Sequence, residues 1–247
     1  GSMLLMALIC GLGMAFLGWM FYRDKPEDCG LLMDGRRISS KVKTTLAAEP
    51  EITLKVALRT YNFWIFCLGL CSLSFIVTGF TFHISSIGAL SGLSRIDSFG
   101  IFLPISFISA ISHLVAGWAS DRTSLKYLLM TLLASLGIGC LGMLHLESFL
   151  FRLLIIFGFG VSGGFYACLA IVTWPRFFGR KHLGSISGTF MGAQVFASAI
   201  GPPIFGISEK LTGDYSSAAW IAIVLNMVLL LGATQAVSFY HGNCSQN

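Results

Sequence analysis

The sequence predicts an all-α membrane protein with seven transmembrane helices, and two observations carry this prediction. The first is composition, because hydrophobic residues make up 55% of the 247 residues and charged residues only 11%. A typical soluble domain carries about 25% charged residues, so this chain has too little charge to cover a surface that faces water. The second is pattern: uncharged runs of at least 20 residues recur along the chain. Each run is long enough for a helix to cross a hydrocarbon core of about 30 Å.

The runs follow one another from end to end of the chain. The strands of a membrane barrel would instead show alternating segments of about 10 residues, and the sequence does not have them. The predicted helices therefore correspond to the seven runs Gly1–Tyr22, Thr60–Ser94, Ser98–Ser120, Tyr127–Leu146, Leu153–Pro175, Leu183–Ser208 and Tyr215–Asn247.

The runs and the polar stretches between them divide the chain into four regions. Residues 1–22 form the first transmembrane helix, and residues 23–61 form a central loop that contains a short amphipathic helix. Residues 62–240 form a unit of six transmembrane helices, and residues 241–247 form a tail.

The basic residues predict how the chain is oriented. When the connections are assigned alternately to the two sides, 13 of the 16 Lys and Arg residues fall on one side and 3 on the other. The positive-inside rule places the richer side in the cytoplasm, so the N-terminus is outside and the central loop and C-terminus are inside. The net charge of +5 thus points to a lipid surface and not to a nucleic acid. A plasma membrane or a bacterial inner membrane is the expected location.

Two motifs give the chain a resemblance to a known family. Residues 117–126, GWASDRTSLK, resemble the Gly-x-x-x-Asp-Arg/Lys signature of the major facilitator superfamily. Residues 172–188, VTWPRFFGRKHLGSISG, resemble the junction of the tenth and eleventh helices in its oxalate/formate antiporter and monocarboxylate transporter group. Residues 26–35, His83 and Gly201-Pro202-Pro203 also fit this group. The resemblance implies helices six to twelve of a twelve-helix carrier, that is, the C-terminal half-bundle and one preceding helix.

Four residues are predicted to line a substrate pathway. His113 is the one ionisable residue well inside a predicted span, and such residues commonly face a cavity or a partner. In anion-transporting relatives an arginine occupies the place of His113, and oxalate-type relatives have a lysine at Gln194, so the resemblance implies these two positions and also Tyr166 and His83. The alternative for His113 is a hydrogen bond to a neighbouring helix.

The resemblance also implies a gating motif at the cytoplasmic ends of the helices. It comprises Gly117, Asp121, Arg122 and Lys126, and the alternative is a solvated surface pair that contributes about 0–1 kcal/mol. Small residues at four-residue spacing further predict close helix packing. The predicted packing positions are Gly160, Gly164, Gly184, Gly188, Gly192, Gly201 and Pro202.

These features predict a secondary transporter that moves a small organic anion or monocarboxylate by alternating access, with proton coupling left open. Its expected partners are the lipid bilayer, the solute, and either an N-terminal half or a second copy of the chain. The sequence shows no nucleotide-binding loop, catalytic constellation or metal-ligand cluster, so no enzyme activity, metal or cofactor is expected. The main alternative is a non-transporting membrane protein with a structural or regulatory role. A seven-helix receptor fits less well, because Asn-Pro-x-x-Tyr is missing from the last span.

Overall fold

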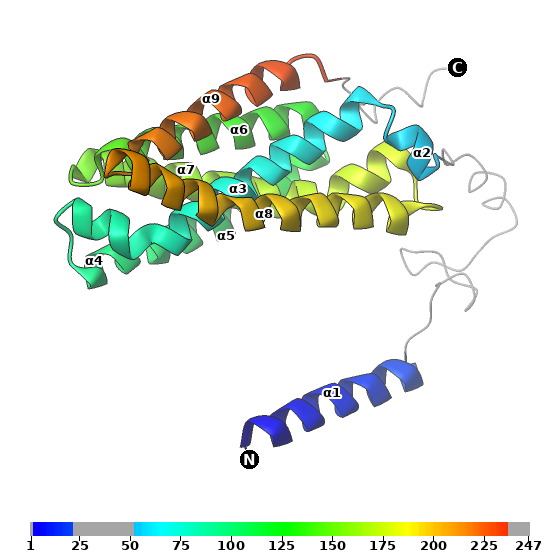
Figure 1. Ribbon diagram of the computed structural model, residues 1–247. Helices are drawn as coiled ribbons and strands as arrows, with labels where there is room; N and C mark the ends of the chain where they lie inside the picture. The colour runs from blue at the N-terminus through cyan, green and yellow to red at the C-terminus, as the bar shows by residue number, and fades with distance from the viewer. Residues whose placement is uncertain (1, 22–51, 237–247) are drawn as a thin grey trace, which may run out of the picture. The chain divides into compact units, whose positions relative to one another are not determined.

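The structure is a computed structural model that describes residues 2–21 and 52–236. Within these ranges every regular element is a helix (Figure 1). The chain divides into two compact units, Gly1–Glu49 and Pro50–Asn247. The first unit contains α1 (Ser2–Phe21), a helix of 20 apolar or small residues, and the second contains all the other helices.

The helices of the second unit begin and end as follows: α2 Leu54–Ala57, α3 Tyr61–Leu90, α4 Arg95–Gly100, α5 Phe102–Ser120, α6 Leu125–Gly142, a 3₁₀ turn Met143–His145, α7 Phe149–Phe178, α8 Leu183–Thr212 and α9 Ser216–Ala233. In the described part of the chain, 6 helical stretches of this unit are long and apolar enough to cross a membrane. One of them combines α4 with α5, and another combines α6 with the 3₁₀ turn. The predicted all-α membrane fold is confirmed, with a six-helix unit preceded by the apolar helix α1.

Both ends of α7 lie beyond the predicted span because charged residues lie inside the helix. The predicted fifth span runs from Leu153 to Pro175, whereas α7 begins at Phe149 and ends at Phe178. It therefore includes Arg152 and Arg176, each within about a turn of one end of the helix. Long basic side chains in terminal turns can extend to the headgroup region while their methylene groups stay in apolar surroundings. A span boundary placed at the first charge is consequently too short.

The central loop predicted at residues 23–61 lies largely outside the described residues, and so does the tail at residues 241–247. The described end of the loop contains the short helix α2, whose Ala57 is completely buried. The Thr60 hydroxyl then accepts a hydrogen bond from the Phe63 amide at 3.3 Å and caps the N-terminus of α3.

The second unit is built around α3. In the most apolar stretch of α3, 67% of the residues are buried. The corresponding share is 17% in the spans Arg95–Ser120 and Leu183–Thr212. Helix α8 packs along α3, α5 packs along α7, and α6 packs along both α7 and α9. Figure 1 shows α3 running across the bundle beside α8. Helices α5 and α8 thus lie at the margins of the unit, each with one face left open.

An aromatic cluster joins three of these helices at the end where α3 begins. The ring centroid of Trp174 lies 5.4 Å from that of Phe63 on α3 and 4.8 Å from that of Phe190 on α8. Phe178 stacks on the same indole ring. Trp174 is buried, so the structure gives it a packing role in the core.

Candidate functional site

A cavity of about 610 Å³ lies between α3, α5 and α7 and contains the predicted site residue His113. Most of its lining is apolar, including Val77, Phe102 and Phe159. The polar groups in the lining are the hydroxyls of Thr81, Ser106 and Ser109 and the imidazole of His113. A mainly apolar cavity with a few convergent polar groups is the usual form of a small-molecule site.

The position of His113 depends on a close approach of α5 to α7. A methyl group added at Gly164 on α7 would lie 2.5 Å from the Ser109 carbonyl oxygen and 2.6 Å from the His113 amide nitrogen. Because glycine leaves that space empty, Nδ1 of His113 comes within 3.3 Å of the Gly164 carbonyl oxygen. A carbonyl oxygen can only accept, so Nδ1 donates in this bond and Nε2 accepts when the ring is neutral. Protonation would make Nε2 a second donor.

Tyr166 and Gln194 form a second polar group, which joins α7 to α8 and also touches α3. The Tyr166 hydroxyl interacts with the side chains of Ser74 and Gln194. The Oε1 atom of Gln194 is shielded from solvent and has no hydrogen-bond partner in the described part of the chain. An unpaired buried acceptor costs about 1–3 kcal/mol, which makes Gln194 a candidate to bind a donor. Between residues 52 and 236 no hydrogen bond joins this group to His113.

His83 lies apart from the cavity, in a contact between α3, α8 and the start of α9. Its Nε2 atom is 3.0 Å from the Pro202 carbonyl oxygen, and its Nδ1 atom is 3.1 Å from the Tyr215 hydroxyl. The imidazole also stacks on the Phe205 ring at a centroid distance of 6.4 Å. Both ring nitrogens are therefore engaged, and the bonds connect three helices.

The predicted gating residues make three separate sets of contacts. Asp121 forms an ion pair with Arg176 at 2.8 Å, and Arg176 also donates to the Ser120 carbonyl oxygen. The end of α5 is thereby tied to the end of α7. Arg122 instead lies over the Trp118 ring, 4.5 Å from its centroid, and donates to the Trp118 carbonyl oxygen.

Lys126 belongs to a different helix contact. Its ammonium group donates to the Thr234 carbonyl oxygen just after α9. The Tyr61 hydroxyl donates to the nearby Gly232 carbonyl oxygen at 2.8 Å. A cation is favourable at a helix C-terminus, where carbonyl groups lack partners. Lys126 and Tyr61 therefore hold the end of α9 against α6 and α3.

Of the predicted packing positions, Gly160, Gly164 and Gly201 lie in close helix contacts. A methyl group at Gly160 would lie 2.7 Å from Cγ2 of Ile108 on α5, and one at Gly201 would overlap the Phe75 carbonyl oxygen on α3. Pro202 follows Gly201 in the same contact through its bond to His83.

The other three predicted packing positions lie in open space. Nothing lies within 4 Å of a methyl group placed at Gly184, Gly188 or Gly192. Gly117 of the gating motif has the same open surroundings. These four positions make no close contact within the described chain, so a packing role for the row on α8 stays a prediction that requires another surface.

Arg176, Ser74 and Asn226 take part in the interhelical contacts although the site prediction did not include them. Arg176 is recognisable from the sequence as a cation at the end of an apolar run. Its pairing with Asp121 is not, because the two residues are 55 positions apart. Asn226 is buried on α9 and donates to the Leu133 carbonyl oxygen on α6 at 2.9 Å. That bond ties α9 to α6 inside the apolar bundle, as side-chain amides between membrane helices commonly do.

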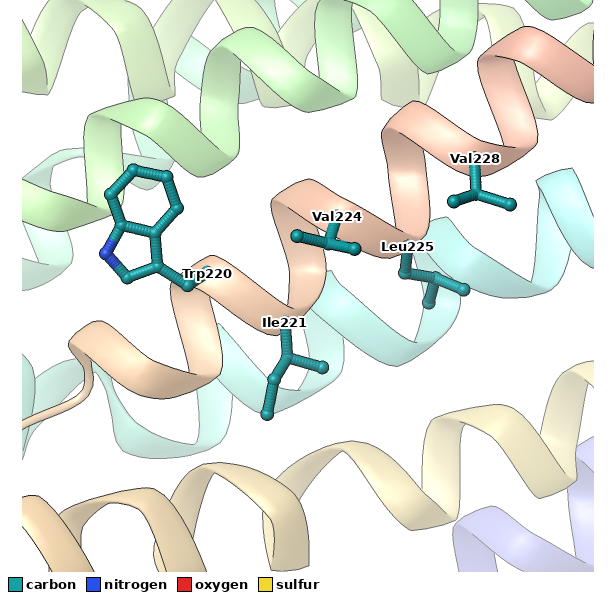
Figure 2. Close-up of a pocket in the computed structure, with 5 residues that line it drawn as sticks. All are labelled: Trp220, Ile221, Val224, Leu225 and Val228. Atoms are coloured by element: carbon teal, nitrogen blue, oxygen red, sulfur yellow. The ribbon is translucent and has the colours of Figure 1, made fainter.

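A second hollow, on the exposed face of α9, has the character of a lipid-facing surface. Figure 2 shows five side chains along this helix. Their one polar atom is the indole nitrogen of Trp220, and each side chain is substantially exposed. The hollow offers nothing that would bind a charged solute. The five residues are Trp220, Ile221, Val224, Leu225 and Val228.

In the two described stretches, no three His, Cys, Asp or Glu side chains gather as a metal site would require. The cysteines Cys67, Cys71, Cys140 and Cys168 are buried and carry free thiols. These thiols pack as small apolar groups.

Comparison with known proteins agrees with this architecture. No curated protein matches the chain. A family model described as Major Facilitator Superfamily matches residues 1–202, which include α1, the cavity with His113 and both motifs identified in the sequence. This family consists of membrane transporters, and the chain belongs to the major facilitator superfamily.

Proposed function

We propose that the chain is the C-terminal part of a secondary active transporter that moves a small organic anion or monocarboxylate by alternating access. The motif at residues 172–188 supports the comparison with the oxalate/formate antiporter and monocarboxylate transporter group. The excess of basic residues at one set of helix ends supports a cytoplasmic central loop and C-terminus and an N-terminus outside.

The single observation that carries the proposal is the cavity around His113. Its volume of about 610 Å³ falls within the usual range for small-molecule sites. The hydroxyl of Ser109 can donate to a carboxylate, whereas that of Ser106 already donates to the Phe102 carbonyl oxygen at 2.9 Å. A protonated His113 adds a charge-assisted donor through Nε2. Because an imidazole can carry either one or two protons, uptake of an anion here can be coupled to a proton.

The two halves of a carrier would meet across the faces of α5 and α8. The spans that contain these helices are the least buried in the unit. Gln194 lies on α8, and Tyr166 of α7 contacts it. In the proposed cycle these faces form part of a central pathway, and the carrier rocks around it. The Asp121–Arg176 ion pair would help hold α5 and α7 together in the state closed to the cytoplasm.

Uptake by the longer carrier, reconstituted in proteoliposomes, tests the proposal. His113→Ala is expected to reduce carboxylate uptake at least tenfold, because removing a charge-assisted hydrogen bond costs about 1.5–3 kcal/mol. Gln194→Ala is expected to produce a smaller loss. The matched control is His145→Ala, since His145 is exposed at the end of α6 and bonds only to Glu147 within the described residues. Wild-type uptake by both site variants would refute the proposed site.

A non-transporting role remains the second candidate, favoured by the large open faces of α5 and α8. In that case the 247-residue chain would bind a partner through those faces and move no solute. We expect the purified chain alone not to transport, because the central pathway of such a carrier forms between two halves and the described unit supplies the helices of one half. Substrate uptake by this chain in proteoliposomes would contradict that expectation, and a mass measurement in detergent would show whether two copies associate.

A further inference from the structure

A third hollow lies at the opposite end of α5 from Asp121, where α4 and α7 begin. Its volume is about 310 Å³, and it shares no lining residue with the cavity around His113. One wall is the first two turns of α7 and the other is α4 with the start of α5. The lining residues are Ile96, Asp97, Gly100, Ile101, Pro104, Phe149, Arg152, Leu153 and Ile156.

The guanidinium of Arg152 lacks a hydrogen-bond acceptor in this hollow. Its Nε atom is shielded from solvent and has no hydrogen-bond partner among residues 52–236. Its Cζ atom lies 6.0 Å from the Phe149 ring centroid, a contact that satisfies none of its N–H groups. No carboxylate in the described chain forms an ion pair with it. A shielded donor on a cation is costly to leave unpaired, so the hollow calls for an anionic oxygen from outside the chain.

The second charged group of the hollow is Asp97, which is held in place by the start of α4. Its amide donates to the Ser94 hydroxyl oxygen at 3.1 Å, and that hydroxyl donates to its Oδ2 atom at 2.7 Å. This reciprocal capping arrangement fixes the carboxylate at the helix N-terminus. The hollow thus presents one cation and one anion that do not pair with each other.

The surroundings of these charges favour an amphiphile over a soluble ion. The side chain of Ile96 is 84% exposed and that of Phe149 is 69% exposed, and both line the hollow. Leu103, seven residues along from Ile96, is also exposed. Because α4 and α7 both start their membrane spans here, Arg152 and Asp97 lie at headgroup level and the apolar side chains face the acyl region.

We propose that this hollow binds a phospholipid with an ethanolamine headgroup. Its phosphate accepts hydrogen bonds from Arg152, its ammonium group pairs with Asp97, and its acyl chains lie along Ile96, Leu103 and Phe149. A choline headgroup also carries a positive charge but has no N–H donor, so Asp97 provides a reason for preferring ethanolamine. A purely anionic headgroup would place negative charge near Asp97.

The test is native mass spectrometry of the whole 247-residue chain, purified and exchanged into defined mixtures of phosphatidylethanolamine, phosphatidylcholine and phosphatidylglycerol. The wild-type chain is expected to retain phosphatidylethanolamine preferentially. Arg152→Gln is expected to reduce retention about tenfold, the equivalent of one charge-assisted hydrogen bond. Asp97→Asn is expected to remove the preference for ethanolamine over choline while total retention falls less. Arg95→Gln is the matched control. Arg95 is an arginine on α4, the helix of Asp97, but it lies over the Phe99 ring and outside the hollow.

Equal retention by the wild type and Arg152→Gln, or equal losses in Arg152→Gln and Arg95→Gln, would overturn the proposal. Displacement of the lipid by soluble phosphoethanolamine would show a headgroup site that needs no acyl chains, which also contradicts it. Photolabelling of the wild-type chain tests the site without relying on variants that must fold. Phosphatidylethanolamine that carries a photoreactive group near the headgroup should label peptides that contain residues 96–104 and 149–156. Labelling confined to other peptides would refute the assignment.

Discussion

Two rows of glycines with the same four-residue spacing, one on α7 and one on α8, lie in different environments. At Gly164 on α7 an added methyl group would lie 2.5 Å from a carbonyl oxygen of α5. At Gly188 on α8 it would meet nothing within 4 Å. The spacing produces a shallow groove along a helix in both places, but only the groove on α7 is occupied. The comparison shows that a small-residue row marks a possible contact, and that the partner decides whether the contact exists.

The largest effect is expected from Gly164→Ala. The new methyl group would press on the Ser109 carbonyl oxygen and the His113 amide nitrogen, and backbone atoms in a packed helix pair cannot move aside cheaply. We expect the free energy of unfolding to fall by about 1–3 kcal/mol, measured by denaturation in detergent micelles. Uptake should fall as well, because the same contact positions the His113 ring.

Gly188→Ala is the matched control for this substitution. Its methyl group enters open space, and alanine is the better helix former by up to about 1 kcal/mol. No loss of unfolding free energy is expected. Equal losses at Gly164 and Gly188 would show that the two rows do not differ as described.

Gly201→Ala extends the comparison along α8 itself. Gly201 contacts the Phe75 carbonyl oxygen and Gly79 of α3, so α8 is packed at this glycine although the glycine face nearer its start is open. The expected loss of unfolding free energy is about 1–2 kcal/mol, measured in the same way. A neutral result would mean that the contact of Gly201 with α3 relaxes without cost.

A larger side chain at Gly188, in the glycine row on α8, distinguishes an effect on folding stability from an effect on contact with the other half of the carrier. Gly188→Leu is expected to change the unfolding free energy of the 247-residue chain by no more than about 0.5 kcal/mol. In the longer carrier, the same substitution should reduce uptake at least fivefold if the row on α8 meets the other half there. Unchanged uptake would show that this row faces lipid or the open pathway.

The smallest effect concerns the turn that connects the packed end of α8 to α9. The Asp214 carboxylate accepts hydrogen bonds from the Ser216 hydroxyl and amide and from the Thr212 hydroxyl, and these bonds lower its pKa. The unfolded chain has an ordinary pKa of about 4 for this group, so the stabilisation is present above that pH. It disappears as the pH falls through the lower pKa of the folded chain.

Thermal melting of the wild type and Asp214→Asn as a function of pH measures this contribution. The difference between their melting temperatures should be small and constant above about pH 5 and should shrink below about pH 4. A difference that grows on acidification would have the wrong sign for a lowered pKa.

Hydropathy alone predicted the helices of this fold, because a membrane span must be long, apolar and internally hydrogen-bonded. The motif around Asp121 was also recognisable from sequence. Its partner was not, since Arg176 lies 55 residues away and meets Asp121 only after α5 packs on α7. The same holds for Lys126, which sequence groups with Asp121 but which binds the end of α9. Local spacing identifies residues that can interact, and the tertiary fold selects the partners.

The residues of the candidate site could be proposed from the sequence, but their contacts could not, because the tertiary fold selects the partners. His113 could be recognised as an ionisable residue inside a span, and the structure places it in a cavity. The bonds of His83 to Pro202 and Tyr215 could not be anticipated, because they need three helices to converge. The open surroundings of Gly188 were equally inaccessible to a spacing argument, which takes no account of what lies opposite.

The prolines at positions 202 and 203 have a mechanical consequence for α8. Neither has an N–H group, so the carbonyls of Ser198 and Ala199 lose their usual donors four residues later. Bending the helix at this level breaks fewer bonds than bending it elsewhere. The segment that begins at Gly201 is anchored on α3, whereas the segment around Gly188 is free along one face. The point of lowest stiffness therefore lies between two packed segments, one held on α3 at Gly201 and one held on α7 through Phe190 and Trp174. Helix α8 can bend there while both contacts persist.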